Sequence, residues 1–216
     1  LEEDRADPEF PYAYGVDVDI NWLPYKDSMY IRSEEKPFEM FSEKGYWLEG
    51  TLILTPNDLR ADGELDWPDG TLSARDMGMG AFSVQSDTAR IAIKALENQE
   101  EIAVSNDSVQ AFIDFDQKEG NFTSHAGKAV TELPYNLFQT SMDAFDWNME
   151  GKAVTFINSG VDLSNFLSIH PDKDSLRFQG NAASYDLESS TLNIGGVPYI
   201  LSCDALIYPD SGKVTI

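Results

Sequence analysis

The chain has 216 residues, of which 42% are hydrophobic and 12% aromatic. This composition excludes an intrinsically disordered segment, and the length is sufficient to bury a core without disulfide staples. Fifteen Lys and Arg stand against 38 Asp and Glu, a net charge of -23, so the surface potential disfavours nucleic acid and anionic membranes as partners. The acidity is explained most simply by solubility, with cation or calcium binding as the alternative.

A short pattern recurs along the chain. It consists of an apolar residue, a second residue that is Asp in most copies, an aromatic or apolar residue, and then a polar turn. The copies are residues 18–22, 65–67, 113–115 and 145–147, with looser copies at 185–187 and 206–208. The turns are rich in Asp, Asn, Pro and Gly and the flanks in β-branched and aromatic residues, which predicts a β-hairpin at each copy. The uneven spacing favours a meander or jelly roll with insertions over a strict solenoid.

Further strands are expected at residues 50–55, 81–84, 153–157 and 175–178. Residues 88–101 contain good helix formers, but Ile91, Ile93 and Ala95 alternate, so we predict a strand there and keep a short helix as the alternative. The fold class is therefore all-β: an antiparallel hairpin-repeat β-sandwich or jelly roll, or an irregular β-solenoid, with at most short helices.

One all-β segment covering residues 1–216 is the simplest organisation, because no long Pro/Gly/Ser linker divides the chain. An N-terminal layer at 1–49 and a hairpin-repeat body at 50–216 form a finer division. Leu1 is not Met and the last five residues resemble a strand, so we expect a segment of a longer polypeptide. The single cysteine, Cys203, is expected to be a buried, inert thiol.

The motifs of common enzymes are absent from the sequence. His125 and His170 are far apart, and no HExxH, CxxC, GxSxG, GxxxxGK[ST] or GxGxxG spacing occurs. The Met77-Gly78-Met79-Gly80 run predicts a bulge or a loop that packs onto the core. We therefore expect no catalytic residue, no resident cofactor and no zinc site.

The recurrent Asp residues have two interpretations. Asp19, Asp66, Asp114 and Asp146 occupy matching places in the pattern, whereas the two carboxylates of a glycoside hydrolase would be unique. We predict that they accept hydrogen bonds in turns or across strands. The pairs 17/19, 114/116 and 172/174 lack the twelve-residue calcium loop, so calcium stays open without a motif to support it.

The four Trp residues raise the alternative of a carbohydrate platform. Exposed in a row, Trp22, Trp47, Trp67 and Trp147 would stack on sugar rings. Three of them recur at the hairpin pattern, however, where an inward aromatic side chain fills a core. We therefore favour core positions over a platform.

The strand pattern of residues 50–56, 63–67 and 197–205 resembles that of very large, uncharacterised, repetitive β-rich envelope proteins of the Bacteroidetes type. The resemblance implies a periplasmic, outer-membrane-associated or secreted location. It also draws attention to Asp-Ser/Thr-apolar triplets, which are similar to the O-glycosylation acceptor of exported proteins in that group. The acceptors would be Ser28, Thr88, Ser108 and Ser175.

Three functions follow from these observations. The leading hypothesis is a non-catalytic structural or interaction β-module of a large exported envelope protein, whose partners are other segments of the same chain or other envelope proteins. The first alternative is a carbohydrate-binding or glycan-processing module. The second resembles the open β-jellyroll modules of lipopolysaccharide transport, which carry lipid in an apolar interior. No apolar stretch reaches the ~20 residues of a membrane span, so direct membrane insertion is not expected.

Overall fold

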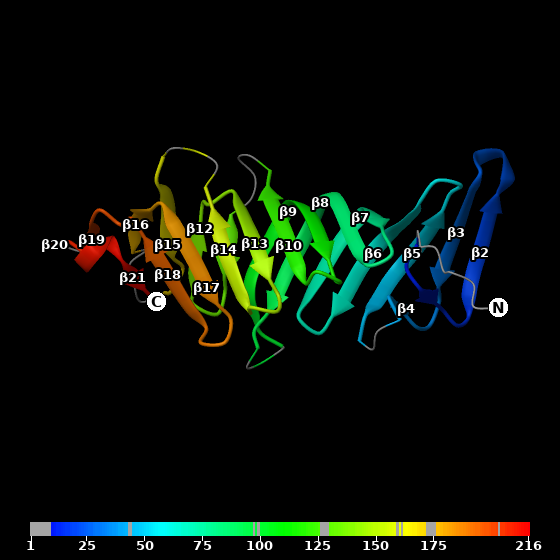
Figure 1. Ribbon diagram of the computed structural model, residues 1–216, viewed down its shortest axis with the longest axis horizontal. Coiled ribbons are helices and arrows are strands. Elements are labelled where there is room, and N and C mark those ends of the chain that lie inside the picture. Colours follow the sequence, from blue (N-terminus) through cyan, green and yellow to red (C-terminus); the bar gives the residue numbers. More distant parts are fainter. Residues whose placement is uncertain are drawn as a thin grey trace.

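The computed structural model describes residues 10–42, 45–96, 98, 100–125, 130–158, 160, 162–171, 176–202 and 204–216. The described chain forms an elongated, open antiparallel sheet, with β2 and β3 at one end and β19 and β20 at the other (Figure 1). The strands are β1 (Ala13–Tyr14), β2 (Val18–Leu23), β3 (Ser28–Ser33), β4 (Phe38–Met40), β5 (Trp47–Leu54), β6 (Leu59–Trp67), β7 (Gly70–Met79), β8 (Ser83–Lys94), β9 (Ile102–Asp114), β10 (Glu119–Ser124), β11 (Thr131–Leu133), β12 (Phe138–Thr140), β13 (Ala144–Asn148), β14 (Ala153–Ile157), β15 (Ser164–Ser168), β16 (Arg177–Gly180), β17 (Ala182–Asp186), β18 (Thr191–Gly195), β19 (Ile200–Ser202), β20 (Ala205–Ile207) and β21 (Val214–Thr215). Helical structure among the described residues is limited to the 3-10 turns η1 (Pro24–Lys26) and η2 (Asp210–Gly212). The all-β prediction is confirmed.

The central part of the sheet consists of strands β5 to β9, and the sheet forks at the first and at the last of them. Residues 51–54 of β5 pair with β3, whereas residues 47–48 pair with β4. At the other fork, residues 109–114 of β9 pair with β10, whereas Ser105 pairs with β11. We call the half of the sheet that contains β2, β3, β10, β13, β14, β17, β18 and β21 branch A, and the half that contains β1, β4, β11, β12, β15, β16, β19 and β20 branch B.

Each central strand runs through both branches because it bends halfway along. The pairing register shifts between Ala61 and Gly63 in β6, and again within β8. Gly50 and Gly63 pair with each other beside the first bend and have φ values of 154° and 148°. A Cβ atom on either residue would overlap a backbone carbonyl of the facing strand, so this approach of β5 and β6 requires glycine.

After β9 the hairpins alternate between the two branches. The β11–β12 hairpin adds to branch B, β13–β14 to branch A, β15–β16 to B and β17–β18 to A, and β19–β20 ends branch B. At the fork, the buried side chain of Asn106 on β9 donates hydrogen bonds to Ser124 of β10 (2.8 Å) and Thr131 of β11 (3.0 Å). Asn106 therefore connects β10 of branch A with β11 of branch B.

The core lies between the two branches and is filled by aromatic and aliphatic side chains. The rings of Trp67 on β6 and Trp147 on β13 lie 6.1 Å apart across the two branches. A Cβ atom on Gly180 of β16 would collide with Ile194 of β18, so the branches are in close contact there too. Burial of this apolar surface is the main force that holds the branches together.

The structure also answers two local questions raised by the sequence. Thr88 to Lys94 belong to β8, so the predicted strand is confirmed and the helical alternative is wrong over these residues. Met77 and Met79 are buried at the end of β7, so the Met-Gly run packs onto the core as expected, but as part of a strand and not as a loop.

Candidate functional site

Three hairpin turns of branch A share one conformation. Each begins with a side-chain oxygen that accepts backbone N–H groups of the turn. Asp114 Oδ1 accepts from residues 116 and 117, at 3.0 and 2.9 Å, and Asp186 Oδ1 accepts from residues 188 and 189, at 2.8 and 3.0 Å. Asn148 Oδ1 takes the same place in the middle hairpin, at 2.5 Å from the N–H of Gly151. The hydrogen bonds from Ser189 and Glu188 hold the pKa of Asp186 below its ordinary value.

A left-handed residue closes each of these turns four positions later. Lys118, Lys152 and Ser190 have φ values of 55°, 49° and 50°. Leu137, in the β11–β12 turn of branch B, has a φ of 57°. This conformation is uncommon for residues other than glycine, so its return at matching positions marks a structural repeat.

The carbonyl groups of these left-handed residues join one hairpin to the next. In three cases the carbonyl accepts a backbone N–H from the following hairpin of the same branch. The pairs are Met149 N–H to Lys118 O at 2.9 Å, Leu187 N–H to Lys152 O at 2.9 Å, and Ile169 N–H to Leu137 O at 2.8 Å. We call these contacts the turn ladder; it occurs in both branches.

Three of the four Asp residues singled out from the sequence make hydrogen bonds of the expected kinds, but these residues do not occupy equivalent places. Asp114 accepts turn N–H groups, Asp146 accepts Nδ2 of Asn121 across the strands (2.9 Å), and Asp66 accepts Lys94 Nζ (2.6 Å). The predicted equivalence of Asp114 and Asp146 is wrong, because Asn148 takes the turn position of Asp114. Asp19 lies opposite Arg32, well before the β2–β3 turn.

The outer face of branch A carries a row of directly opposed, mainly polar side chains. The row runs through Arg60, Gly78, Gln85, Phe112, Asn121, Asp146, Thr155, Ser184, Asn193 and Thr215. Thr215 Oγ1 donates to Asn193 Oδ1 at 3.0 Å, as Asn121 does to Asp146. From Asn121 to Thr215 the result is a strip of polar side chains across adjacent strands, whereas Gly78 and Phe112 break the row over β7 and β9.

A hollow of about 680 Å³ interrupts this row over β6 to β9. Its lining includes Arg60, Gly78, Asp87, Gln110 and half-exposed Phe112, and the side chain of Gln85 lies against Gly78. Arg60 Nε lies 2.5 Å from Asp76, and Asp58 is also within hydrogen-bonding distance. The hydrogen bond to Asp76 raises the pKa of Arg60, so the guanidinium carries a fixed positive charge at the edge of the hollow.

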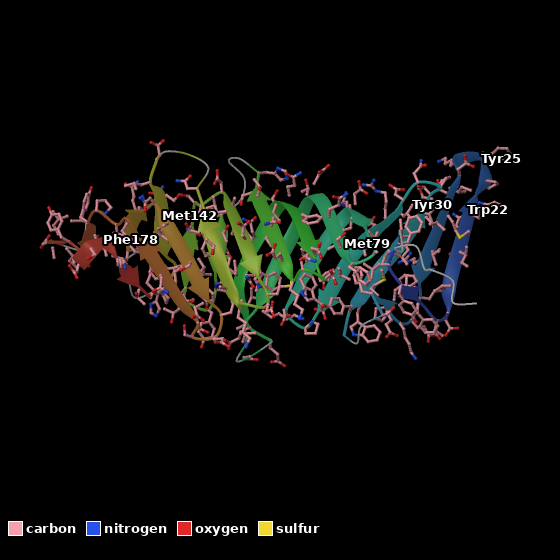
Figure 2. All side chains as sticks on the ribbon, in the orientation of Figure 1. Trp22, Tyr25, Tyr30, Met79, Met142 and Phe178 are labelled. Carbon is pink, nitrogen blue, oxygen red and sulfur yellow. The ribbon has the colours of Figure 1, made fainter. Side chains whose placement is uncertain are left out.

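The four Trp residues divide into two groups. Trp67 and Trp147 are buried in the core, as favoured from the pattern, and their rings are not accessible to a sugar. Trp22 and Trp47 are 66% and 41% exposed, on β2 and β5. The core positions favoured for Trp22 and Trp47 are therefore wrong, because neither side chain is buried. Figure 2 shows Trp22 with Tyr25 on the end hairpin.

Two of the four predicted O-glycosylation residues, Thr88 on β8 and Ser108 on β9, are linked through His125. Thr88 Oγ1 is 3.3 Å from His125 Nε2, and the backbone N–H of His125 donates to the carbonyl of Ser108 at 3.2 Å. Ser28 is on β3 and donates its hydroxyl to the carbonyl of Lys26. Ser175 lies outside the described residues, as do Cys203 and the Asp pair 172/174.

Over the described ranges, no group of three or more His, Cys, Asp or Glu side chains could hold a metal ion. Over the same ranges, no helix is long and apolar enough to cross a membrane. The polar row, the turn ladder and the hollow were not found from sequence, because each depends on which strands become neighbours. The left-handed residues carry little sequence signal, since they are Lys, Ser and Leu instead of Gly.

Comparisons of the chain with protein-family models, with curated proteins and with solved structures found no match. The arrangement of the residues themselves is therefore what supports a function.

Proposed function

We propose that this chain is a structural and interaction module of a large exported cell-envelope protein, located in the periplasm, at the outer membrane or outside the cell. It has no catalytic activity of its own in this proposal. Its partners are neighbouring segments of the same polypeptide or other envelope proteins, and neither nucleic acid nor direct membrane insertion is part of its role.

The turn ladder is the observation that carries the proposal. Three hairpins offer the next hairpin of their branch an edge strand and, in addition, the carbonyl of a left-handed turn residue, as Lys118 does for Met149. Since both branches use this device, stability is distributed along the long axis instead of being concentrated around one site. Such nearest-neighbour stacking is typical of extended scaffolds.

Lengthening the chain by one structural period tests the proposal. Duplicating residues 148–185 in tandem places a second Asn148 where Asp186 now begins its turn, and it adds two strands to each branch. We expect a cooperatively folding protein that is longer by about 10 Å in small-angle X-ray scattering, since neighbouring strands are ~4.8 Å apart. A Gly/Ser insertion of equal length at the same place is the control. It should add a flexible loop and should not lengthen the folded protein by about 10 Å. Loss of cooperative unfolding in the duplicated protein would contradict the proposal, as would glycan hydrolysis that a single carboxylate substitution abolishes.

Glycan binding in the hollow is the second candidate function. The hollow brings the Arg60 guanidinium, the amides of Gln85 and Gln110 and the half-exposed ring of Phe112 onto one face, and a few convergent polar groups beside an apolar surface are typical of ligand sites. If glycans bind there, Phe112→Ala should weaken binding on a glycan array by about tenfold or more, an effect of roughly 1.4 kcal/mol. The matched control is Tyr135→Ala, an exposed aromatic outside the hollow. Equal binding by both variants would remove this candidate.

The lipid-carrying alternative receives less support. It requires an open apolar interior, whereas Trp67, Phe122, Phe145 and Trp147 fill the space between the branches. Two of these rings, Phe122 and Phe145, are stacked with centroids 4.7 Å apart.

A further inference from the structure

The end of the molecule formed by β2 and β3 exposes side chains that belong to the core face of branch A. Ile20 lies directly opposite Ile31, and Ile31 lies opposite Leu52, which is 3% exposed. Directly opposed residues of an antiparallel pair lie on the same face, so Ile20 and its alternate neighbour Trp22 face the core side. They are nevertheless 56% and 66% exposed, because branch B does not cover them. Figure 2 shows Trp22 and Tyr25 at this end of the molecule.

The opposite end has the same feature in the other branch. Phe178 of β16 lies opposite Ile200 of β19, and Ile200 lies opposite Ile207 of β20. Phe178 is 4% exposed, Ile200 is partly buried and Ile207 is 48% exposed. The core face of branch B thus continues past the cover that branch A provides. The same hairpin exposes Leu206 on its other face, and Tyr208 follows it.

The two uncovered faces are complementary, because one belongs to branch A and the other to branch B. We propose that a second copy of this chain binds head to tail, so that the core face of its β2–β3 hairpin covers the core face of the first copy's β19–β20 hairpin. This inference rests on the proposed structural function and names its partner. In the joint, the β2 edge of one copy meets the β21 edge of the other, and the β20 edge meets the β1 edge; each of these strands has one paired neighbour among the described strands.

Several physical terms favour this joint. It removes exposed apolar residues from water, continues the core of both copies, and gives the edge strands partners for their free backbone groups. A same-end contact would instead place two branch A faces together and leave both β19–β20 hairpins uncovered. The net charge of -23 on each copy opposes association at low ionic strength, so the joint should tighten as salt screens the charges.

The test uses one variant at each end, Trp22→Lys and Ile207→Lys. Both side chains are about half exposed or more, so the substitutions should not disturb folding. Both also reduce the net negative charge, so weaker association would not come from greater repulsion. The matched control is Ile157→Lys, which changes an apolar residue on β14 that is 40% exposed but lies away from both ends.

Sedimentation equilibrium at high and low salt gives the readout. The unmodified chain and the Ile157→Lys control should associate, and more strongly at high salt. Each end variant alone should associate at least about tenfold more weakly. An equimolar mixture of the two end variants should form a heterodimer that does not grow, because one intact head remains for one intact tail.

Three results would overturn the inference. They are an unmodified chain that stays monomeric at high salt, an end variant that still associates alone, and a mixture that does not form the heterodimer. The result of the duplication experiment is independent of these, because it measures the length of one monomer. If the duplicated chain folds and lengthens while the mixture stays monomeric, the structural function stands and the second copy is the wrong partner.

Discussion

Replacing one of the buried Trp residues tests the packing of the two branches against each other. Trp147 is 2% exposed and lies 6.1 Å from the ring of Trp67 in the opposite branch. Gly70 leaves room for this ring, since a Cβ atom there would crowd both indoles. Trp147→Ala removes a fully buried aromatic side chain from a site enclosed by backbone, and should lower the free energy of unfolding by about 3–5 kcal/mol.

Trp22→Ala is the matched comparison, because the same chemical change occurs at a side chain that is 66% exposed. We expect it to change the free energy of unfolding by less than about 1 kcal/mol. Urea denaturation followed by far-ultraviolet circular dichroism measures both, with the native and unfolded baselines fitted separately for each variant because indoles also contribute to this signal. Where Trp147→Ala leaves too little folded protein, Trp147→Phe should still cost about 1–3 kcal/mol. Equal effects at positions 22 and 147 would refute the two-branch packing described above.

Three further predictions concern single positions. Lys118→Gly should raise the free energy of unfolding by about 0.5–1 kcal/mol, because glycine adopts the left-handed φ of 55° without strain; a lower melting temperature would contradict the turn geometry. Gly63→Ala should lower the free energy of unfolding by more than about 2 kcal/mol, because its Cβ would overlap the carbonyl of Glu49. Gly195→Ala is the control: its Cβ would have its nearest contact at 3.7 Å, so it should lower the free energy of unfolding by less than half as much in the same denaturation assay. Burial raises the pKa of Tyr185 from 10.0 to about 12, so the stability it contributes is complete below pH 10 and falls by roughly 2–3 kcal/mol as the pH rises to about 12; Tyr185→Phe should remove this alkaline dependence, and an unchanged dependence would show that another group causes it.

Local features of the fold could be predicted from the sequence. The alternation of Ile91 and Ile93 predicts a strand, which β8 confirms as far as Lys94, and Asp beside a turn predicts the hydrogen bonds of Asp114. The burial of Trp67 and Trp147 follows from the size of the indole and from its place next to a turn.

The predictions that were wrong concern positions whose environment depends on contacts between distant segments. Trp22 has the same local pattern as Trp67 and Trp147, yet it is exposed because its hairpin lies beyond the cover of branch B. The equivalence of Asp146 and Asp114 failed because the turn after β13 begins two residues later, at Asn148. The forks at β5 and β9 depend on which half of a strand pairs with which neighbour, and no local pattern encodes that choice.

Hydrogen exchange at three turn amides tests the central claim most directly. The N–H groups of Met149, Leu187 and Ile169 donate to left-handed carbonyls of the preceding hairpins at 2.8–2.9 Å, although all three residues lie outside strands. If stacked turns join the hairpins, these amides should exchange far more slowly than in an unstructured peptide of the same sequence, and with a free energy of opening close to that of the neighbouring strands. Exchange of all three at the peptide rate, with the strands still protected, would contradict the account of this chain as a scaffold of stacked hairpins.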